Sequence, residues 1–277
     1  MLPFADNSKL QSVICSPSDP LSLQSDIDPL VSWTHSNSLL INPRKCAVMR
    51  FFFNECSSPV YCVDGDQISV PLCHHDLGII VCDLSWASHY DSICSKANSS
   101  LYLIHRTFST SLKCAVKKQL YLSMVRSKLC YASQLWRRQL KKHILLLERV
   151  QRRASKYVLG DYTSSYRDRL IQLSLFPLLY WLKLLDIMYL VKSLKFPSDN
   201  MSILEFISFN DSATRSSASH KLKHNFCRTS RSHNSYFNRI VRLWNKLPKI
   251  DLTESLATIK TKLHVCIISL ESFSREL

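Results

Sequence analysis

The spacing of apolar residues divides the chain into two parts with different periods. In residues 1–83 most apolar residues stand in short runs, which are typical of strands. From residue 86 onward they recur at steps of three and four, the period of one helix face. The pattern predicts an α+β fold that is mainly α, with short strands and a hairpin first and helices after them.

The first part is expected to combine one helix with several strands. Residues 19–36 have helical spacing, and Pro29 is a position at which this helix could bend. Asp64 and Gly65 form a turn pair that favours a tight hairpin. Strand character is expected for residues 46–53, 60–63, 67–70 and 76–81.

The second part is expected to be helical throughout, except for one linker. Trp86, Tyr90, Ile93, Ala97, Leu101, Ile104 and Phe108 form one apolar stripe, which predicts a six-turn helix. Further helices are predicted for residues 117–136, 141–159, 166–173, 178–194, 236–244 and 256–270. Residues 209–235, rich in Ser, Asn and Arg, are expected to be a linker or mobile loop. The predicted regions are residues 1–83, 84–200, 201–235 and 236–277.

The chain carries a net charge of +15, and the excess of positive charge is concentrated in one region. Residues 113–156 contain 13 Lys or Arg and a single acid, Glu148. Cations that neutralise phosphates gain free energy from counterion release, whatever the base sequence. Nucleic acid is therefore the favoured partner, and an anionic membrane surface is the alternative.

The predicted helix 141–159 carries the strongest signal of this kind. At about 100° per residue, its basic and apolar residues fall on opposite sides. Like charges at these spacings repel each other, so a phosphate backbone explains the basic stripe better than an ordinary solvated face does. The basic face holds Arg149, Arg152, Arg153 and Lys156, joined by Arg138 and Lys142 if the helix begins earlier, and the packing face holds Leu147, Val150, Ala154 and Tyr157.

Composition excludes several other classes of protein. The eleven cysteines are mostly single in apolar runs, so reduced thiols are expected. A zinc site is not expected, because the local cluster of Cys62, Cys73, His74, His75 and Cys82 lacks CxxC spacing. Three glycines in the chain are too few for a glycine-rich nucleotide loop, and no GxSxG of a hydrolase occurs.

Nothing in the sequence predicts a membrane or secretory segment. The most apolar stretch, residues 175–194, contains Lys183, Asp186 and Lys192, so no membrane span is expected. Residues 1–10 have neither the basic nor the apolar region of a secretory signal. An intracellular location, in the nucleus or cytoplasm, is the expectation.

A series of short motifs runs along most of the chain. The first are FADNSKL at 4–10, LQSD at 23–26, Trp33, NSL at 37–39 and NPRKC at 42–46. Later ones are DLGI at 76–79, Trp86 with His89, KA at 96–97, VRSKL at 125–129, YAS at 131–133, Trp136, LERVQRRA at 147–154, Tyr166 with RL at 169–170, YF at 236–237 and WNKLP at 244–248. In this order and spacing they resemble the reverse transcriptases of non-LTR (LINE-type) retrotransposons, whose FADD motif the first one matches in part.

The resemblance implies a fold and an activity. Residues 1–83 would be the last part of the polymerase palm, and the helical remainder the thumb and the segment beyond it. In the family, two adjacent aspartates at a hairpin turn and a third from an upstream strand hold two Mg²⁺ ions for RNA-directed DNA synthesis. Asp6 matches the first aspartate and is the implied metal ligand. RNA or an RNA–DNA duplex is the implied partner.

The sequence departs from the family where catalysis depends on it. Asn7 stands in place of the second aspartate, and an amide lacks the negative charge that a divalent ion prefers. The upstream aspartate would lie before Met1. A smaller departure is Trp181-Leu182, where the family carries a basic pair. We therefore expect no autonomous polymerase activity.

Three hypotheses remain open on the sequence. The chain is a truncated polymerase without activity, a non-catalytic remnant that grips RNA or an RNA–DNA duplex through its basic thumb helices, or a subunit that completes its site with a separate fragment. Strongly salt-dependent binding without sequence preference would distinguish the second from the first.

Overall fold

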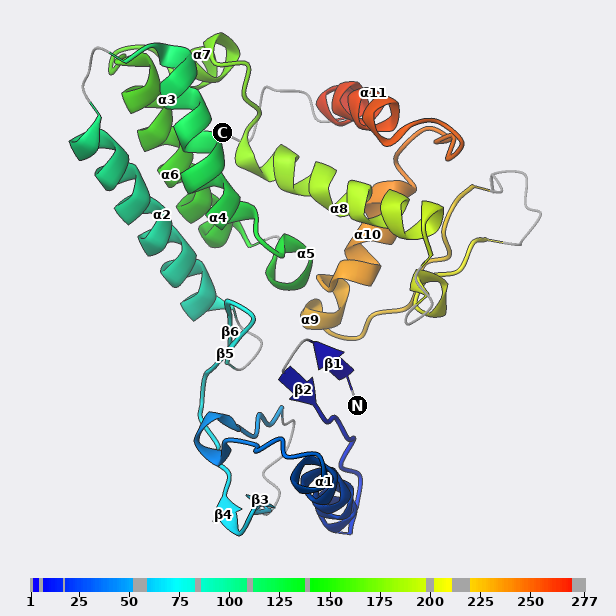
Figure 1. The fold of residues 1–277 in the computed structure, drawn as a ribbon. Coiled ribbons are helices and arrows are strands. Elements are labelled where there is room, and N and C mark those ends of the chain that lie inside the picture. Colours follow the sequence, from blue (N-terminus) through cyan, green and yellow to red (C-terminus); the bar gives the residue numbers. More distant parts are fainter. Residues whose placement is uncertain are drawn as a thin grey trace. The chain divides into compact units, whose positions relative to one another are not determined.

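The fold is α+β and mainly α, as the apolar pattern predicts. The computed structural model describes residues 2–4, 7–16, 18–51, 59–82, 86–108, 112–137, 140–197, 202–210 and 220–270 (Figure 1). Two compact units follow one another along the chain, Met1–Ser88 and His89–Leu277. The described helices include none with the length and apolar character needed to cross a bilayer.

In its described residues, the first unit contains helix α1 and three antiparallel hairpins. Helix α1 (Asp19–Ser36) has the predicted bounds, and Pro20 lies in its first turn. Its Ile27 packs in a small core with Tyr61, Val63 and Ile68. The hairpins pair β1 (Leu2–Phe4) with β2 (Asn7–Lys9), β3 (Cys62–Val63) with β4 (Asp66–Gln67), and β5 (His74–Asp76) with β6 (Ile79–Val81).

Two of these hairpins close with the same backbone geometry. Asp64 and Gly65 have φ values of 53° and 81°, so the predicted hairpin at this pair is confirmed. Leu77 and Gly78 have φ values of 47° and 82°, and the chain reverses there. Two positive φ values define the turn whose twist matches paired strands. The prediction of one strand over residues 76–81 is therefore wrong, because Gly78 supplies the left-handed conformation that ends a strand.

The prediction for residues 46–53 is not confirmed as a strand over the described part, residues 46–51. Ala47 forms a single parallel bridge with Ser69, and the Val48 amide donates to the Ser69 carbonyl at 2.9 Å. Residues 52 and 53 lie outside the described residues. The apolar side chains of Cys46 and Val48 instead pack against the core around Ile27.

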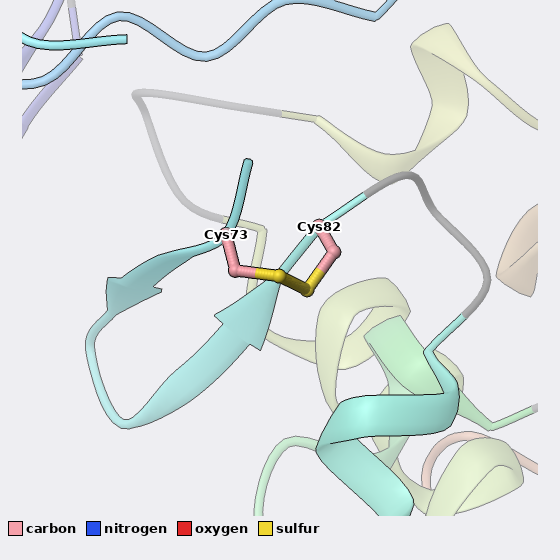
Figure 2. Close-up of a disulfide and its surroundings, with 2 residues drawn as sticks. All are labelled: Cys73 and Cys82. Atoms are coloured by element: carbon pink, nitrogen blue, oxygen red, sulfur yellow. A yellow bond between two sulfur atoms is a disulfide. The ribbon is translucent and has the colours of Figure 1, made fainter. Parts of the chain in front are cut away.

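A disulfide joins Cys73 and Cys82 at the open end of the β5–β6 hairpin (Figure 2). The register pairs His74 with Val81, so the cysteines are the next residues on either side, with Cα atoms 4.1 Å apart. The expectation of reduced thiols is wrong for this pair, because a spacing of nine residues does not reveal that a turn brings the two opposite each other. The other described cysteines are free thiols, as expected.

The described residues of the second unit form mainly helices. Except for residues 117–136, the predicted helices have the observed bounds within two residues. The helices are, in chain order, α2 (Ala87–Thr107), α3 (Cys114–Leu120), η2 (Tyr121–Arg126, a π turn), α4 (Ser127–Cys130), α5 (Ser133–Trp136), α6 (Lys141–Leu159), α7 (Tyr166–Gln172), α8 (Leu178–Lys195), η3 (Ile203–Glu205), α9 (Ser230–His233), α10 (Tyr236–Trp244) and α11 (Leu256–Leu270).

The predicted continuous helix over residues 117–136 is wrong. The chain passes through the π turn η2 and then breaks before α5, where Ala132 has a φ of 47°. The break buries Trp136 completely and lets its indole N–H donate to the Tyr131 carbonyl at 2.8 Å. A buried indole N–H requires such an acceptor, which a continuous helix does not offer.

Helix α8 is the central helix of the second unit. It contacts α5, α6, α10 and α11 (Figure 1). Ile187 and Leu190 of α8 are fully buried with Ile240 of α10 and Leu263 of α11 in one apolar cluster. The C-terminal helices α10 and α11 therefore pack on α8, the same helix that the basic helix α6 contacts.

Part of the predicted linker belongs to this core. Leu222 is 2% exposed within the cluster, and Phe209 bridges Leu222 as in an antiparallel pair. Helix α9 also lies within residues 209–235. The prediction of a linker is therefore wrong for these described residues, and residues 211–219 lie outside the described part.

Candidate nucleic-acid interface

Helix α6 presents its basic residues to solvent and packs with its other half. Leu147, Val150, Ala154, Tyr157 and Val158 are each less than a tenth exposed. Lys142, Arg149 and Arg153 are exposed, and Arg152 and Lys156 are half-buried. The division of faces that the sequence predicts is therefore observed. Arg138 lies outside the described residues.

The single acid of the basic region does not lie on the exposed face. Glu148 is 1% exposed, and its carboxylate accepts from the Tyr166 hydroxyl at 2.5 Å and from the Leu179 amide at 3.1 Å. The amide belongs to the first turn of α8, where a negative charge is favourable. Burial raises the pKa of Glu148, against the lowering effect of these hydrogen bonds. The exposed face of α6 is thus left with cations and no acid of its own.

A buried hydrogen-bond network fixes the orientation of α6. The Gln151 side chain donates to the Tyr166 hydroxyl and to the Phe176 carbonyl, both at 2.9 Å, and accepts from Tyr121 at 2.7 Å. Glu148 and Gln151 stand three residues apart on one face, so both point toward α7 and α8. Sequence reasoning missed this network, although two polar residues at that spacing on a packing face are a signal for it.

The basic side chains differ in how firmly neighbours hold them. The Arg152 guanidinium lies over the Tyr166 ring, 4.9 Å from its centroid. Arg153 donates to the Asn98 side chain of α2 at 3.2 Å, and the residue as a whole is exposed. Within the described parts of the chain, Lys142, Arg149 and Lys156 form no ion pair. These cations are therefore available to a phosphate backbone.

Other cations of the basic region have structural roles instead. Lys117 and Arg126 are each less than a tenth exposed and lie over aromatic rings, Lys117 over Tyr157 and Arg126 over Trp181. The guanidinium of Arg126 is 3.9 Å from the centroid of Trp181, and Lys260 lies 5.2 Å from the same ring. Trp181, the departure from the family pattern, is thus flanked by cations from other elements.

Arg137 belongs to a buried ionic cluster that sequence reasoning missed. Asp186 of α8 is fully buried and accepts from Arg137 and, at 2.9 Å, from the Nε of Arg239. Arg239 also donates to the Arg137 carbonyl at 2.9 Å. A charged residue inside an apolar helix was the available signal, because a buried charge needs a partner.

The implied metal site is only partly within the described residues. Phe4 of β1 pairs with Asn7 of β2, and Asp6 lies outside the described residues. Among the described residues, no three His, Cys, Asp or Glu side chains gather as a metal ion would require. In the sequence, Asp6 and Asn7 supply one carboxylate and one neutral amide, a set of ligands that does not fit two Mg²⁺ ions.

The cysteine and histidine cluster around the β5–β6 hairpin offers no metal site among the described residues either. Cys73 and Cys82 bond to each other, so neither is a thiolate ligand. His74 and His75 are successive strand residues and point to opposite faces of the hairpin.

Comparisons of this chain with protein-family models, with curated proteins and with solved structures found no match.

Proposed function

We propose that this chain is part of a reverse transcriptase of a non-LTR (LINE-type) retrotransposon, and that it grips RNA or an RNA–DNA duplex without polymerising DNA by itself. The observation that carries the proposal is the exposed face of α6. Five cations, Lys142, Arg149, Arg152, Arg153 and Lys156, lie on it, while the one acid of the region is buried.

The physical case for binding rests on this separation of charge. Like charges three and four residues apart destabilise a helix by about 0.2–0.5 kcal/mol per pair. Phosphates relieve that repulsion and release their counterions. The buried Glu148–Tyr166–Gln151 network holds the helix so that the cations face outward. Such contacts position a duplex without reading its sequence.

The case against polymerisation by this chain alone rests on the carboxylates. The motif that resembles the family's catalytic pair supplies Asp6 and the neutral Asn7. Two divalent ions held by one carboxylate would lack most of the ligands that stabilise them. We therefore propose no catalytic step for this chain, and Mg²⁺ has no assigned role in it.

A salt series with a labelled RNA–DNA hybrid tests the proposal. We expect the wild-type chain to bind with an affinity that falls steeply as salt rises, because each phosphate contact releases about one counterion. The variant Arg149→Gln, Arg152→Gln, Arg153→Gln and Lys156→Gln should bind about ten- to hundredfold more weakly in low salt, with a shallower salt slope. Fluorescence anisotropy of the hybrid measures both quantities.

A variant with the same change of net charge provides the control. Arg44, Lys45, Arg106 and Lys192 are exposed and lie outside α6. Their replacement by Gln should leave binding close to that of the wild type. If both quadruple variants lose the same affinity, overall charge and not α6 governs binding, and the proposed interface is wrong.

A further inference from the structure

A second basic segment lies beyond the helices that the proposed function uses. Residues 220–249 contain eight Lys or Arg and no Asp or Glu. Their charge density is comparable to that of the region around α6, although the segment is far from α6 in the sequence. Arg239 is buried beside Asp186, and the exposed cations of this run have no acid within it to balance them.

The start of this segment is held in place by α10 and the residues that follow it. The Asn245 side chain accepts from the Leu222 amide at 2.8 Å and donates to the Leu222 carbonyl at 2.9 Å. The Trp244 indole donates to the His220 carbonyl at 2.9 Å. On the other side, the Asn210 amide donates to the Lys221 carbonyl at 2.8 Å. The backbone before residue 223 is therefore pinned to the core.

A second tie to α10 lies about ten residues further along the chain, at His233. The Arg242 guanidinium donates to the His233 carbonyl at 2.7 Å. The Thr229 hydroxyl caps α9 by accepting from the Ser232 amide at 3.1 Å. Residues 223–231 thus span two anchored points of the second unit.

Between these points the chain exposes an aromatic ring among cations. Phe226 is 89% exposed, among the most exposed of the large apolar residues described. Lys223, Arg228 and Arg231 are exposed on either side of it in the sequence. Within the described parts of the chain, none of these three cations forms an ion pair.

Each of these features alone is ordinary. Single exposed apolar residues are common on protein surfaces, and exposed cations more so. Together, an exposed ring and unpaired cations within five residues of it in the sequence are what single-stranded nucleic acid requires, because bases stack on aromatic rings while cations follow the backbone. A duplex keeps its bases stacked inside and cannot use the ring in this way.

We propose that residues 223–231 form a second interface, which binds single-stranded RNA or DNA by stacking a base on Phe226 and contacting phosphates with Lys223, Arg228 and Arg231. The inference rests on nucleic-acid binding as the proposed function, but not on the family assignment. It adds a separate site for a separate form of the ligand.

The test uses the full chain and a fluorescein-labelled 15-nucleotide oligouridylate, measured by anisotropy in low salt. Phe226→Leu keeps an exposed apolar side chain but removes the ring, and should weaken binding about tenfold. Phe226→Trp keeps a stacking surface and should bind at least as tightly as the wild type. The variant Lys223→Gln, Arg228→Gln and Arg231→Gln should bind more weakly than the wild type and with a shallower salt slope.

The same variants measured with the RNA–DNA hybrid separate this proposal from the first. Phe226→Leu should leave hybrid binding unchanged, while the α6 variant should weaken it. Equal oligouridylate binding by the wild type and Phe226→Leu overturns the stacking site, even if α6 binds the hybrid as proposed. If the α6 variant and its charge-matched control lose the same affinity for the hybrid, the first proposal is wrong and this one still stands. A wild-type chain that binds no oligouridylate also overturns the second interface.

Discussion

At the scale of single residues, the buried His89 makes the stability of the second unit depend on pH. His89 of α2 is 2% exposed and lies beside Trp136, with ring centroids 5.3 Å apart. Burial, with a smaller contribution from the charge of Lys96, lowers the pKa of His89 from 6.5 to about 4. The folded chain therefore holds this imidazole neutral at pH values where the unfolded chain protonates it.

The sign of the resulting pH dependence follows from this difference. Between pH 6.5 and 4 the unfolded state binds the additional proton, so folding is favoured most above pH 6.5 and less as the pH falls. We expect a loss of roughly 1–2 kcal/mol in the free energy of unfolding between pH 7.5 and pH 5 from this group. His89→Phe keeps a ring beside Trp136 and should lose less over the same interval. Urea unfolding followed by tryptophan fluorescence at both pH values checks this, and equal losses would contradict the assignment.

Among the elements, α10 and the residue that follows it hold an irregular segment in place by hydrogen bonds to its backbone. The motif WNKLP has a structural role here, since Trp244 and Asn245 bind the backbone of His220 and Leu222. The sequence predicts a linker or mobile loop in this region, because few large apolar residues occur there. Hydrogen bonds to backbone atoms leave no trace in that pattern.

We expect Asn245→Ala to destabilise the second unit by about 1–3 kcal/mol, because the buried Leu222 would lose the partners of both its amide and its carbonyl. Hydrogen exchange at the Leu222 amide should become much faster. Asn225→Ala, at an exposed position in the same segment, serves as the matched control and should change neither quantity. Unchanged protection of Leu222 in Asn245→Ala would show that the clamp does not hold the segment.

At the scale of the helical unit, one buried charge connects elements that are distant in the sequence. Asp186 of α8 bonds to Arg137, just after α5, and to Arg239 of α10. Burial lowers the pKa of Arg239, while the neighbouring Asp186 opposes that effect. Three charges with a net positive sum are therefore held away from water, and the carboxylate is the group that makes this tolerable.

Removal of that carboxylate should destabilise the whole unit. We expect Asp186→Asn to lower the free energy of unfolding by about 3–5 kcal/mol, because two buried guanidiniums would lose their counter-charge. Asp91→Asn, at an exposed position on α2, should have little effect. Chemical denaturation of the two variants beside the wild type measures the difference. A loss below about 1 kcal/mol for Asp186→Asn would mean that the cluster is not needed for stability.

The sequence by itself determined the fold class, the bounds of the long helices and the two faces of α6. Those features follow from the period of apolar residues, which depends only on local geometry. The positions of Arg149, Arg152, Arg153 and Lys156 on one exposed face belong to the same kind of inference.

Only the tertiary structure decided which polar groups pair and which remain exposed. The burial of Glu148, the cluster around Asp186, the Cys73–Cys82 bond and the clamp of Asn245 all join residues through a turn or across helices. Such pairings depend on where separate elements meet, which the period of one segment does not encode. The exposure of Phe226 is of the same kind, because an aromatic residue in a sequence is equally suited to a core or to a ligand.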